Sequence, residues 1–397
     1  MRLGIANLLH NLNRTVLSLA GIGFAIVLIF MQMGFRGSVA TTATLIYSKM
    51  KFDLMIRSPD YLHFCDARFV ERDRMFELAS LPGVERVVPF QVMLHYWQIP
   101  DNELTRRYEL AGETRGVIAM ATDPHEDVFK IDEIQRKMQQ LATHESILMD
   151  RKSRAEYGPT DGTKFSAADI GVVTEVAGRQ VQIAETIELG TGLAANGAFL
   201  TSLAGFQRLT PEMGANNASF GLLQLQPGEK PREVRRRINA FLTENFGDRP
   251  PYEVLTRSEV MLRELKRWLR DTPIGAIFTM GVVVAFMVGA AIFYMILSSD
   301  VANQISEYAT LLAMGYTQRF LSGVVLIQAV SLAVLAFVPA WLVSEVLYRV
   351  TSHAAGIPIT MTGTRPLYVL AMSVLMCFVS GLGALRKLRA ADPADLF

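Results

Sequence analysis

Four long stretches of this sequence are apolar and almost free of charge. They run from Val16 to Gly34, Ile274 to Leu297, about Leu321 to Val346, and Leu367 to Leu385. A helix rises about 1.5 Å per residue, so about 20 apolar residues cross the roughly 30 Å hydrocarbon core of a bilayer. Each stretch reaches or approaches that length. The expected fold class is therefore a membrane protein with four transmembrane α-helices.

The composition agrees with this interpretation. Half of the residues are hydrophobic and 19% are charged, whereas about a quarter are charged in an ordinary soluble protein. The first stretch could also be a cleaved signal peptide, because Arg14 precedes it and Ser38-Val39-Ala40 resembles a cleavage site. It is longer than the usual apolar core of a signal peptide, so a retained membrane anchor is expected. The net charge of +1 gives no indication of nucleic-acid binding.

Lysine and arginine in short flanks predict the orientation. Six of them lie on the side shared by both termini: Arg2, Arg14, Arg319, Arg386, Lys387 and Arg389. Only Arg349 and Arg365 lie in the short loop on the other side. Positive residues favour the cytoplasm, so both termini are predicted to be cytoplasmic and the long segment after the first span to lie outside it.

The expected organisation follows directly. It comprises a cytoplasmic amphipathic helix (1–15), the first transmembrane helix (16–35), a periplasmic α+β domain (36–272), the second helix (273–298), a cytoplasmic coupling loop (299–320), the third helix (321–347), a short periplasmic loop (348–366), the fourth helix (367–385) and a cytoplasmic tail (386–397).

Local patterns within the large segment predict strands and helices. Alternating residues and turn signals give a strand at Val84–Gln98, a hairpin over Asp169–Glu188 that turns at Ala177-Gly178-Arg179, and a strand at Phe220–Gln226. Pro231 is predicted to open a helix that ends at Gly247. Thr256 and Glu259 have the spacing of a capping box, which predicts a last helix reaching Arg270.

The sequence contains none of the usual signatures of an energy-converting or hydrolytic enzyme. The nearest approach to a phosphate-binding loop, Gly158 to Phe165, has Thr163 in place of its second glycine and Phe165 in place of its hydroxyl residue. The six histidines are scattered, and the two cysteines lie too far apart in sequence for a metal or redox motif. No catalytic, cofactor-binding or metal-binding residue is therefore predicted.

Two groups of polar residues leave alternatives open. Gln328 and Ser331, inside the third apolar stretch, are expected to make interhelical hydrogen bonds, with a transport path as the alternative. Charged residues at mid-depth, typical of ion-coupled carriers, are missing from the stretches. Asp123, His125, Glu126 and Asp127 could in principle hold a metal, but a solvated turn around Pro124 is the expected structure.

The segment from Asp300 to Phe320 is the most informative of the expected cytoplasmic parts. Val301, Ile305, Tyr308 and Leu312 recur on one helical stripe. Gly315 then provides a natural helix stop, and Thr317 can cap the next helix. Such a short helix between two spans suits docking on a separate motor protein, with a plain connector as the alternative.

Segments along nearly the whole chain resemble the MacB/FtsX superfamily of ABC permeases, and within it the DevC-like permeases of DevBCA-type glycolipid exporters. The resemblance is carried by Leu17–Phe35, Leu148–Gly158, Glu188–Gly197, Thr272–Phe278, Ser299–Tyr316 and Asp392-Pro393. It implies a non-catalytic inner-membrane subunit that uses no cofactor of its own, since ATP is hydrolysed by a partner. It also implies a homodimer that contacts membrane lipids and works with a separate ABC ATPase, a periplasmic membrane fusion protein and a TolC-like outer-membrane channel.

The stripe and the resemblance together predict the residues that couple to the ATPase: Glu307, Tyr308, Leu311, Leu312, Met314 and Gly315. The expected function is transmission of ATPase motion to a periplasmic domain that moves a lipid, glycolipid or other cargo outward. A lipoprotein-release permease, and a signalling subunit that activates a periplasmic hydrolase, remain as alternatives. The identity of the cargo does not follow from the sequence.

Overall fold

The computed structural model describes the backbone of residues 12–247 and 249–390, with their side chains except at 12–14, 312, 355 and 385–390. Most of the predicted amphipathic helix at 1–15, and the side chains and end of the tail at 386–397, thus lie outside the described residues. The chain divides into two compact units. We call residues 1–39 and 272–397 the helical unit, and residues 40–271 the large domain.

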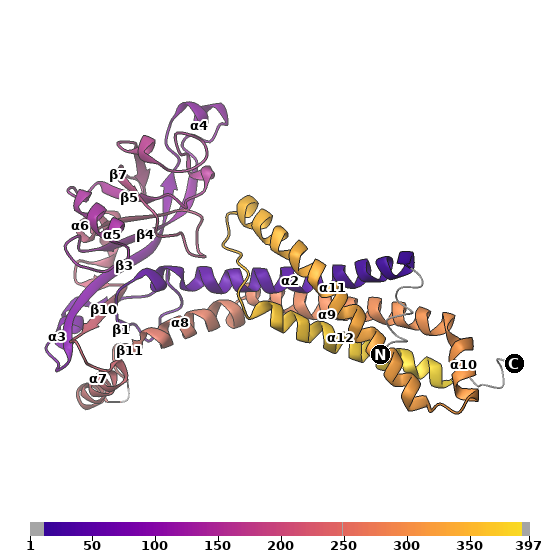
Figure 1. Cartoon of the computed structure of the whole chain (residues 1–397). Coiled ribbons are helices and arrows are strands. Elements are labelled where there is room, and N and C mark those ends of the chain that lie inside the picture. The colour runs from indigo at the N-terminus through magenta and orange to yellow at the C-terminus, as the bar shows by residue number, and fades with distance from the viewer. Residues whose placement is uncertain (1–11, 248, 391–397) are drawn as a thin grey trace. The chain divides into compact units, whose positions relative to one another are not determined.

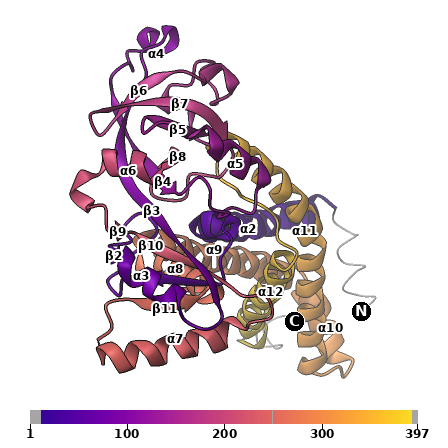
Figure 2. The same ribbon diagram turned by 90° about the vertical axis from the view of Figure 1, so that its left-hand side faces the viewer.

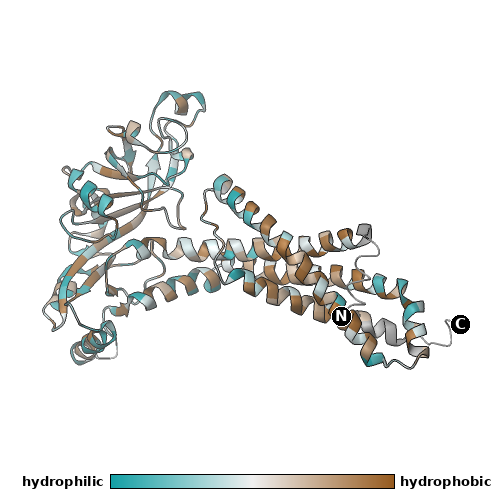
Figure 3. Ribbon diagram, viewed as in Figure 1, coloured by the Kyte–Doolittle hydropathy of each residue, from teal (hydrophilic) through white to brown (hydrophobic). Residues whose placement is uncertain are grey.

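Long helices make up the helical unit (Figure 1). They are α2 (Leu12–Lys49, whose last turns belong to the large domain), α9 (Pro273–Asn303), α11 (Gln318–Ala355) and α12 (Arg365–Ala390), with the short α10 (Ile305–Ala313) between α9 and α11. The four long helices are long and apolar enough to cross a membrane, and Figure 3 shows their predominantly hydrophobic colouring. Each extends beyond the predicted span, so the positions of the membrane boundaries stay predictions.

Small residues allow these helices to approach closely. A Cβ on Gly289 would overlap Met376 of α12 and lie 3.0 Å from the Cβ of Ala25 of α2. Hydrogen bonds add to this packing, because the Ser380 hydroxyl donates to the Ala290 carbonyl at 2.7 Å. The amide of the buried Gln328 donates to Asp300 of α9 at 3.4 Å, which confirms its predicted interhelical role.

The large domain is organised around one long strand, β3 (Val84–Gln98). Its first half joins a four-stranded antiparallel sheet with β10 (Phe220–Leu225), β1 (Leu54–Arg57) and β11 (Glu253–Thr256), in the order β11-β1-β10-β3. Helices α3 (Arg72–Ala79) and α7 (Pro231–Phe246) pack on this sheet. They enclose a hydrophobic core that includes Leu54, Leu78, Leu223 and Ile238.

The second half of β3 belongs to a closed barrel (Figure 2). Its strands follow β3 in the order β4 (Thr114–Thr122), β8 (Ala198–Ser202), β5 (Ser146–Asp150), β7 (Arg179–Ile187) and β6 (Val173–Val176). The barrel closes where Trp97 of β3 pairs with Val176 of β6. Trp97, Phe165 and Phe199 lie in its hydrophobic core.

Shorter elements complete the large domain. They are β2 (Val70–Glu71) paired with β9 (Asn217–Ala218), α4 (Glu103–Arg107), α5 (Asp132–Lys137), α6 (Leu203–Leu209) and α8 (Arg257–Lys266), with single 3-10 turns between them. Helix α8 continues as a π-helical turn over Arg267–Asp271, directly before α9.

The predicted local structure of the large domain is confirmed. Strand β3 spans Val84–Gln98 as expected, and the hairpin turns at Ala177 and Gly178, which both have positive φ. Helix α7 begins at Pro231 and ends before Gly247. The capping box of Thr256 and Glu259 is present, although the regular α-helix that it starts ends at Lys266, before the predicted Arg270. Four apolar helices with an α/β domain between the first and second agree with the predicted fold class.

Candidate functional site

The segment between α9 and α11 contains the residues that the sequence singled out for coupling. Helix α10 covers Ile305–Ala313 and is separated from α9 by Gln304, whose backbone leaves the helical region at φ −103° and ψ 12°. The predicted stripe from Val301 to Leu312 is therefore divided between two helices. Val301 and Tyr308 nevertheless belong to one buried cluster.

Tyr308 faces inward rather than towards solvent. It is 4% exposed and packs with Val301, Leu321 and Val325, while its hydroxyl donates to the Gln304 side chain at 2.9 Å. Leu311 packs against the same cluster. These two side chains hold α10 in place, and the buried Tyr308 offers little area to a partner. A coupling role for them stays a prediction, and the geometry makes it a positioning role.

The end of α10 depends on its glycine. Gly315 has φ +92°, and the Tyr316 N–H donates to the Leu311 carbonyl at 3.1 Å, the reversal expected of a glycine-terminated helix. A β-branched side chain in this left-handed conformation would be strained even though the surrounding space is empty. Gly315 thus sets the direction in which the chain leaves α10.

The exposed residues of this segment include two that the sequence analysis missed. Met314, Tyr316 and Phe320 are 62%, 47% and 43% exposed, and the rings of Tyr316 and Phe320 lie 5.0 Å apart. We call these three residues the apolar corner. Thr317 accepts the Phe320 N–H at 3.3 Å and so starts α11 as predicted. The i, i+4 spacing of the two aromatic residues around this cap was the signal that could have identified the corner.

Two further predicted coupling residues remain. Glu307 is exposed on α10, where its carboxylate is available to a cationic partner. The side chain of Leu312 lies outside the described residues. The apolar corner and Glu307 therefore form part of the exposed surface of the segment, and Tyr308 with Leu311 its internal support.

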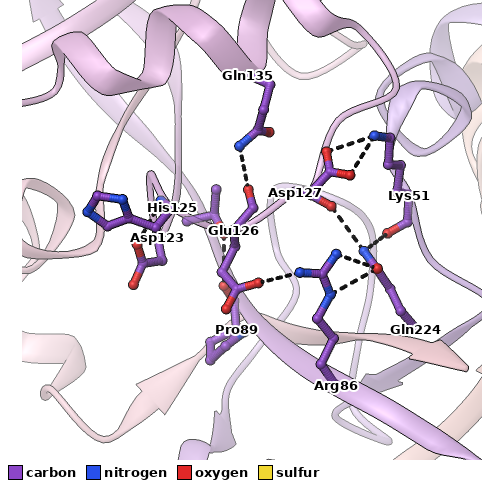
Figure 4. Close-up of polar contacts among 10 residues, drawn as sticks. Lys51, Arg86, Pro89, Asp123, His125, Glu126, Asp127, Gln135 and Gln224 are labelled. Atoms are coloured by element: carbon purple, nitrogen blue, oxygen red, sulfur yellow. Dashed lines mark hydrogen bonds and ion pairs between the residues drawn. The ribbon is translucent and has the colours of Figure 1, made fainter. Parts of the chain in front are cut away.

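The acidic cluster around Pro124 forms a turn, as expected, and its carboxylates diverge (Figure 4). Asp127 pairs with Lys51 at 2.7 Å, Glu126 pairs with Arg86 at 3.1 Å, and Asp123 accepts the backbone N–H of His125 at 2.9 Å. Across the described ranges 12–247 and 249–390, no three His, Cys, Asp or Glu side chains converge as a metal site would require.

The near-match to a phosphate-binding loop also has a structural role. Gly158 ends a 3-10 turn in the left-handed conformation, and Phe165 is 1% exposed within the barrel core. A phosphate-binding loop instead turns its backbone N–H groups toward a ligand at the start of a long helix. The arrangement of this stretch therefore differs from that of a phosphate-binding loop.

Comparison with known protein families gives a match for one part of the chain. Residues 279–393 match the family model described as FtsX-like permease C-terminal. This stretch covers most of α9 and all of α10, α11 and α12, so it includes the apolar corner. No curated protein gives a significant match.

Solved structures with similar domains show only weak likeness. They include the extracellular domain of the ABC-type transporter YknZ from Gram-positive bacteria (14% identity, 52% of this chain, 99% of that chain, TM-score 0.33), the periplasmic region of MacB from Actinobacillus actinomycetemcomitans (6%, 55%, 94%, 0.35) and a domain of a putative permease protein from Porphyromonas gingivalis (13%, 53%, 91%, 0.32). At these TM-scores we draw no functional conclusion from them. The family match is therefore confined to residues 279–393, which resemble the FtsX-like permease C-terminal family.

Proposed function

We propose that this chain is the membrane subunit of an ABC-type permease of the MacB/FtsX kind, driven by a separate ATPase that docks on the segment between α9 and α11. The proposal is carried by one observation. The family match contains a short helix whose inner face is fixed by buried side chains and whose end presents an exposed apolar corner.

The arrangement suits the transmission of motion. Tyr308 ties α10 to the cluster formed with Val301 of α9 and Leu321 of α11, so a push on α10 moves both helices. Exposed Met314, Tyr316 and Phe320 offer apolar area, and Glu307 offers a charge. Aromatic residues and methionine are enriched in the centres of protein interfaces. The ATP would be hydrolysed by the partner.

The proposal extends to the export system in which this subunit would work. As a DevC-like subunit, a homodimer of this chain would sit in the inner membrane with both termini in the cytoplasm and the large domain in the periplasm. There it would work with a membrane fusion protein and a TolC-like channel to export a lipid, glycolipid or other cargo. Co-purification separates the alternatives, because a fusion protein supports export, a lipoprotein carrier supports lipoprotein release, and a peptidoglycan hydrolase supports signalling.

The docking surface can be tested with two substitutions. Met314→Asp places a charge in the apolar corner, and Gly315→Val strains the left-handed turn and redirects the chain. Loss of a central interface side chain typically costs about 2 kcal/mol, so ATPase affinity should fall on the order of 30-fold. The measurement is ATPase stimulation by the purified permease, together with export in cells.

Val350→Asp is the matched control, since Val350 is 58% exposed on α11 but far along that helix from the corner. It should leave stimulation and export unchanged. Normal stimulation by both Met314→Asp and Gly315→Val, at normal protein levels, would show that the segment is only a connector.

A further inference from the structure

The large domain has two connections to the rest of the chain, and they contact each other inside it. The chain enters through the last turns of α2 and leaves through α8 and the π-helical turn over Arg267–Asp271. Contacts between the end of α2 and the face of α8 decide whether these two connections can move separately.

Arg257, the first residue of α8, binds the end of α2. Its guanidinium donates to the carbonyls of Tyr47, Ser48 and Met50 at 2.8–2.9 Å. The last carbonyls of a helix lack partners within the helix, and a cation is favourable there. The guanidinium also lies over the Phe52 ring at 5.1 Å. Arg257 of α8 thereby caps the C-terminal end of α2.

Glu264 makes a second connection further along α8. Its carboxylate is buried, with the residue 1% exposed. It accepts hydrogen bonds from the Tyr61 hydroxyl at 2.8 Å, the Trp268 indole N–H at 3.0 Å and the Phe64 N–H at 3.2 Å. Burial raises the pKa of this carboxyl, while the three donors oppose that shift.

Tyr61 extends this connection to α2. Its single hydroxyl proton is donated to Glu264, so the Tyr47 hydroxyl, in contact with the same oxygen, donates to Tyr61. Tyr47 lies near the end of α2 with no exposed surface, and its ring meets Phe64 edge-on at 5.2 Å. The leaving helix is thus joined to the entering helix by a chain of two part-buried hydrogen bonds.

The spacing of the two connections places them on one side of α8. Arg257 and Glu264 are seven residues apart, which is two helical turns, and the fully buried Val260 lies between them. Leu262, on the opposite side, is 68% exposed. Helix α8 therefore presents a single face, with a cation at one end and a carboxylate at the other, to the end of α2.

We propose that Arg257 and Glu264 are positioning residues that clasp α8 to α2, so that the large domain receives motion from its two connections as one body. This inference rests on the proposed function in one respect, namely that motion from the helical unit has to reach this domain. A buried carboxylate is costly to desolvate and is weak evidence for stability alone. The three donors to Glu264 come from Tyr61, Trp268 and Phe64. They fix the position of α8 relative to the end of α2, which indicates a positioning role.

The experiment uses the full chain with its ATPase in lipid nanodiscs. Glu264→Gln keeps the shape of the side chain but replaces one carboxylate oxygen, an acceptor, with an NH2 group. That group would face the N–H and O–H donors that now bind Glu264. Hydrogen–deuterium exchange should become faster on the order of tenfold at 44–50 and 61–66, on both sides of the clasp. ATPase stimulation should stay at the wild-type level while export falls, because the motor is still docked but its motion no longer reaches the large domain.

Glu229→Gln is the control. It removes an ion pair with Arg237, and neither of these two residues lies on α2 or α8. It should change neither exchange in the two segments nor export. Should Glu264→Gln fail to fold, Tyr61→Phe removes the hydroxyl that donates to Glu264 and accepts from Tyr47, while Glu264 keeps its bonds from Trp268 and Phe64. It should give the same exchange pattern at 44–50.

The outcomes separate the two proposals. Faster exchange confined to α8, or unchanged export in a variant with a broken clasp, would overturn the clasp. If the wild-type chain stimulates no ATPase, the proposed function fails, yet the exchange measurement still shows whether the two connections are joined.

Discussion

In the large domain, carboxylates are buried where several donors surround them, as at Asp150 and Glu264. In the helical unit the close contacts are made instead by glycine and alanine, as at Gly289 and Ala25. Lipid is as apolar as the helix surfaces, so helices in a bilayer associate through close packing rather than through hydrophobic burial. In water, apolar burial drives folding, so buried polar groups can serve to fix the positions of neighbouring segments. The two units should therefore be sensitive to different substitutions.

Asp150 is the strongest example in the large domain. It has no exposed surface, and its carboxylate accepts the N–H groups of Lys152 at 2.8 Å, Leu189 at 3.1 Å and Gly190. These bonds join the end of β5 to the glycine-rich loop that follows β7. One side chain thus satisfies backbone groups from two separate segments.

Asp150→Ala should produce the largest effect. It leaves the buried N–H groups of Leu189 and Gly190 without an acceptor. Each unsatisfied buried group costs about 1–3 kcal/mol, so the two together should cost about 2–6 kcal/mol. Asp161→Ala is the control, because Asp161 also accepts two backbone N–H groups but is exposed, so water can replace it. Thermal unfolding of the purified full chain measures both. Equal losses would contradict the importance of burial at Asp150.

The same carboxyl predicts a pH dependence. Burial raises the pKa of Asp150 to about 6, so the folded state holds this proton more tightly than the unfolded chain, where the pKa is about 3.9. The stabilisation is complete below about pH 4 and is lost as the pH rises through about 6. Relative to Asp150→Asn, the wild type should gain up to about 3 kcal/mol on acidification from pH 7 to pH 4. A difference that is constant across pH would refute the shift.

Asp150 also explains part of what the sequence could and could not predict. The segments Leu148–Gly158 and Glu188–Gly197 carry the family resemblance at two separate places in the sequence, and the structure joins them through this carboxylate. Strand, hairpin and capping signals are local, so β3, the turn at Gly178 and the start of α8 could be predicted. Contacts between distant segments carry no such local signal.

Two features depended on those distant contacts. Barrel closure requires Trp97 to meet Val176, and neither strand shows in its own sequence which edge it will join. The stripe on α10 correctly indicated a buried face, but Tyr308 buries that face against Leu321 and Val325 of the next helix rather than against a partner. Periodicity identifies which residues are buried, and only the fold identifies what covers them.

The last prediction tests close packing in the helical unit, with a smaller expected effect. A Cβ on Gly34 of α2 would lie 2.6 Å from the ring of Tyr348, which is 1% exposed and whose hydroxyl donates to the Phe30 carbonyl. The ring is held and cannot move aside, so Gly34→Ala should cost about 1–3 kcal/mol through overpacking, partly offset by the better helix propensity of alanine. Gly323→Ala on α11 is the control, because a Cβ there meets nothing within 4 Å, and it should stabilise the unit slightly. Reaction of the buried Cys377 with a fluorogenic thiol reagent during heating, in a Cys65→Ala background, reports opening of the helices. A Gly34→Ala midpoint at or above that of Gly323→Ala would show that close packing at Tyr348 does not stabilise the helical unit.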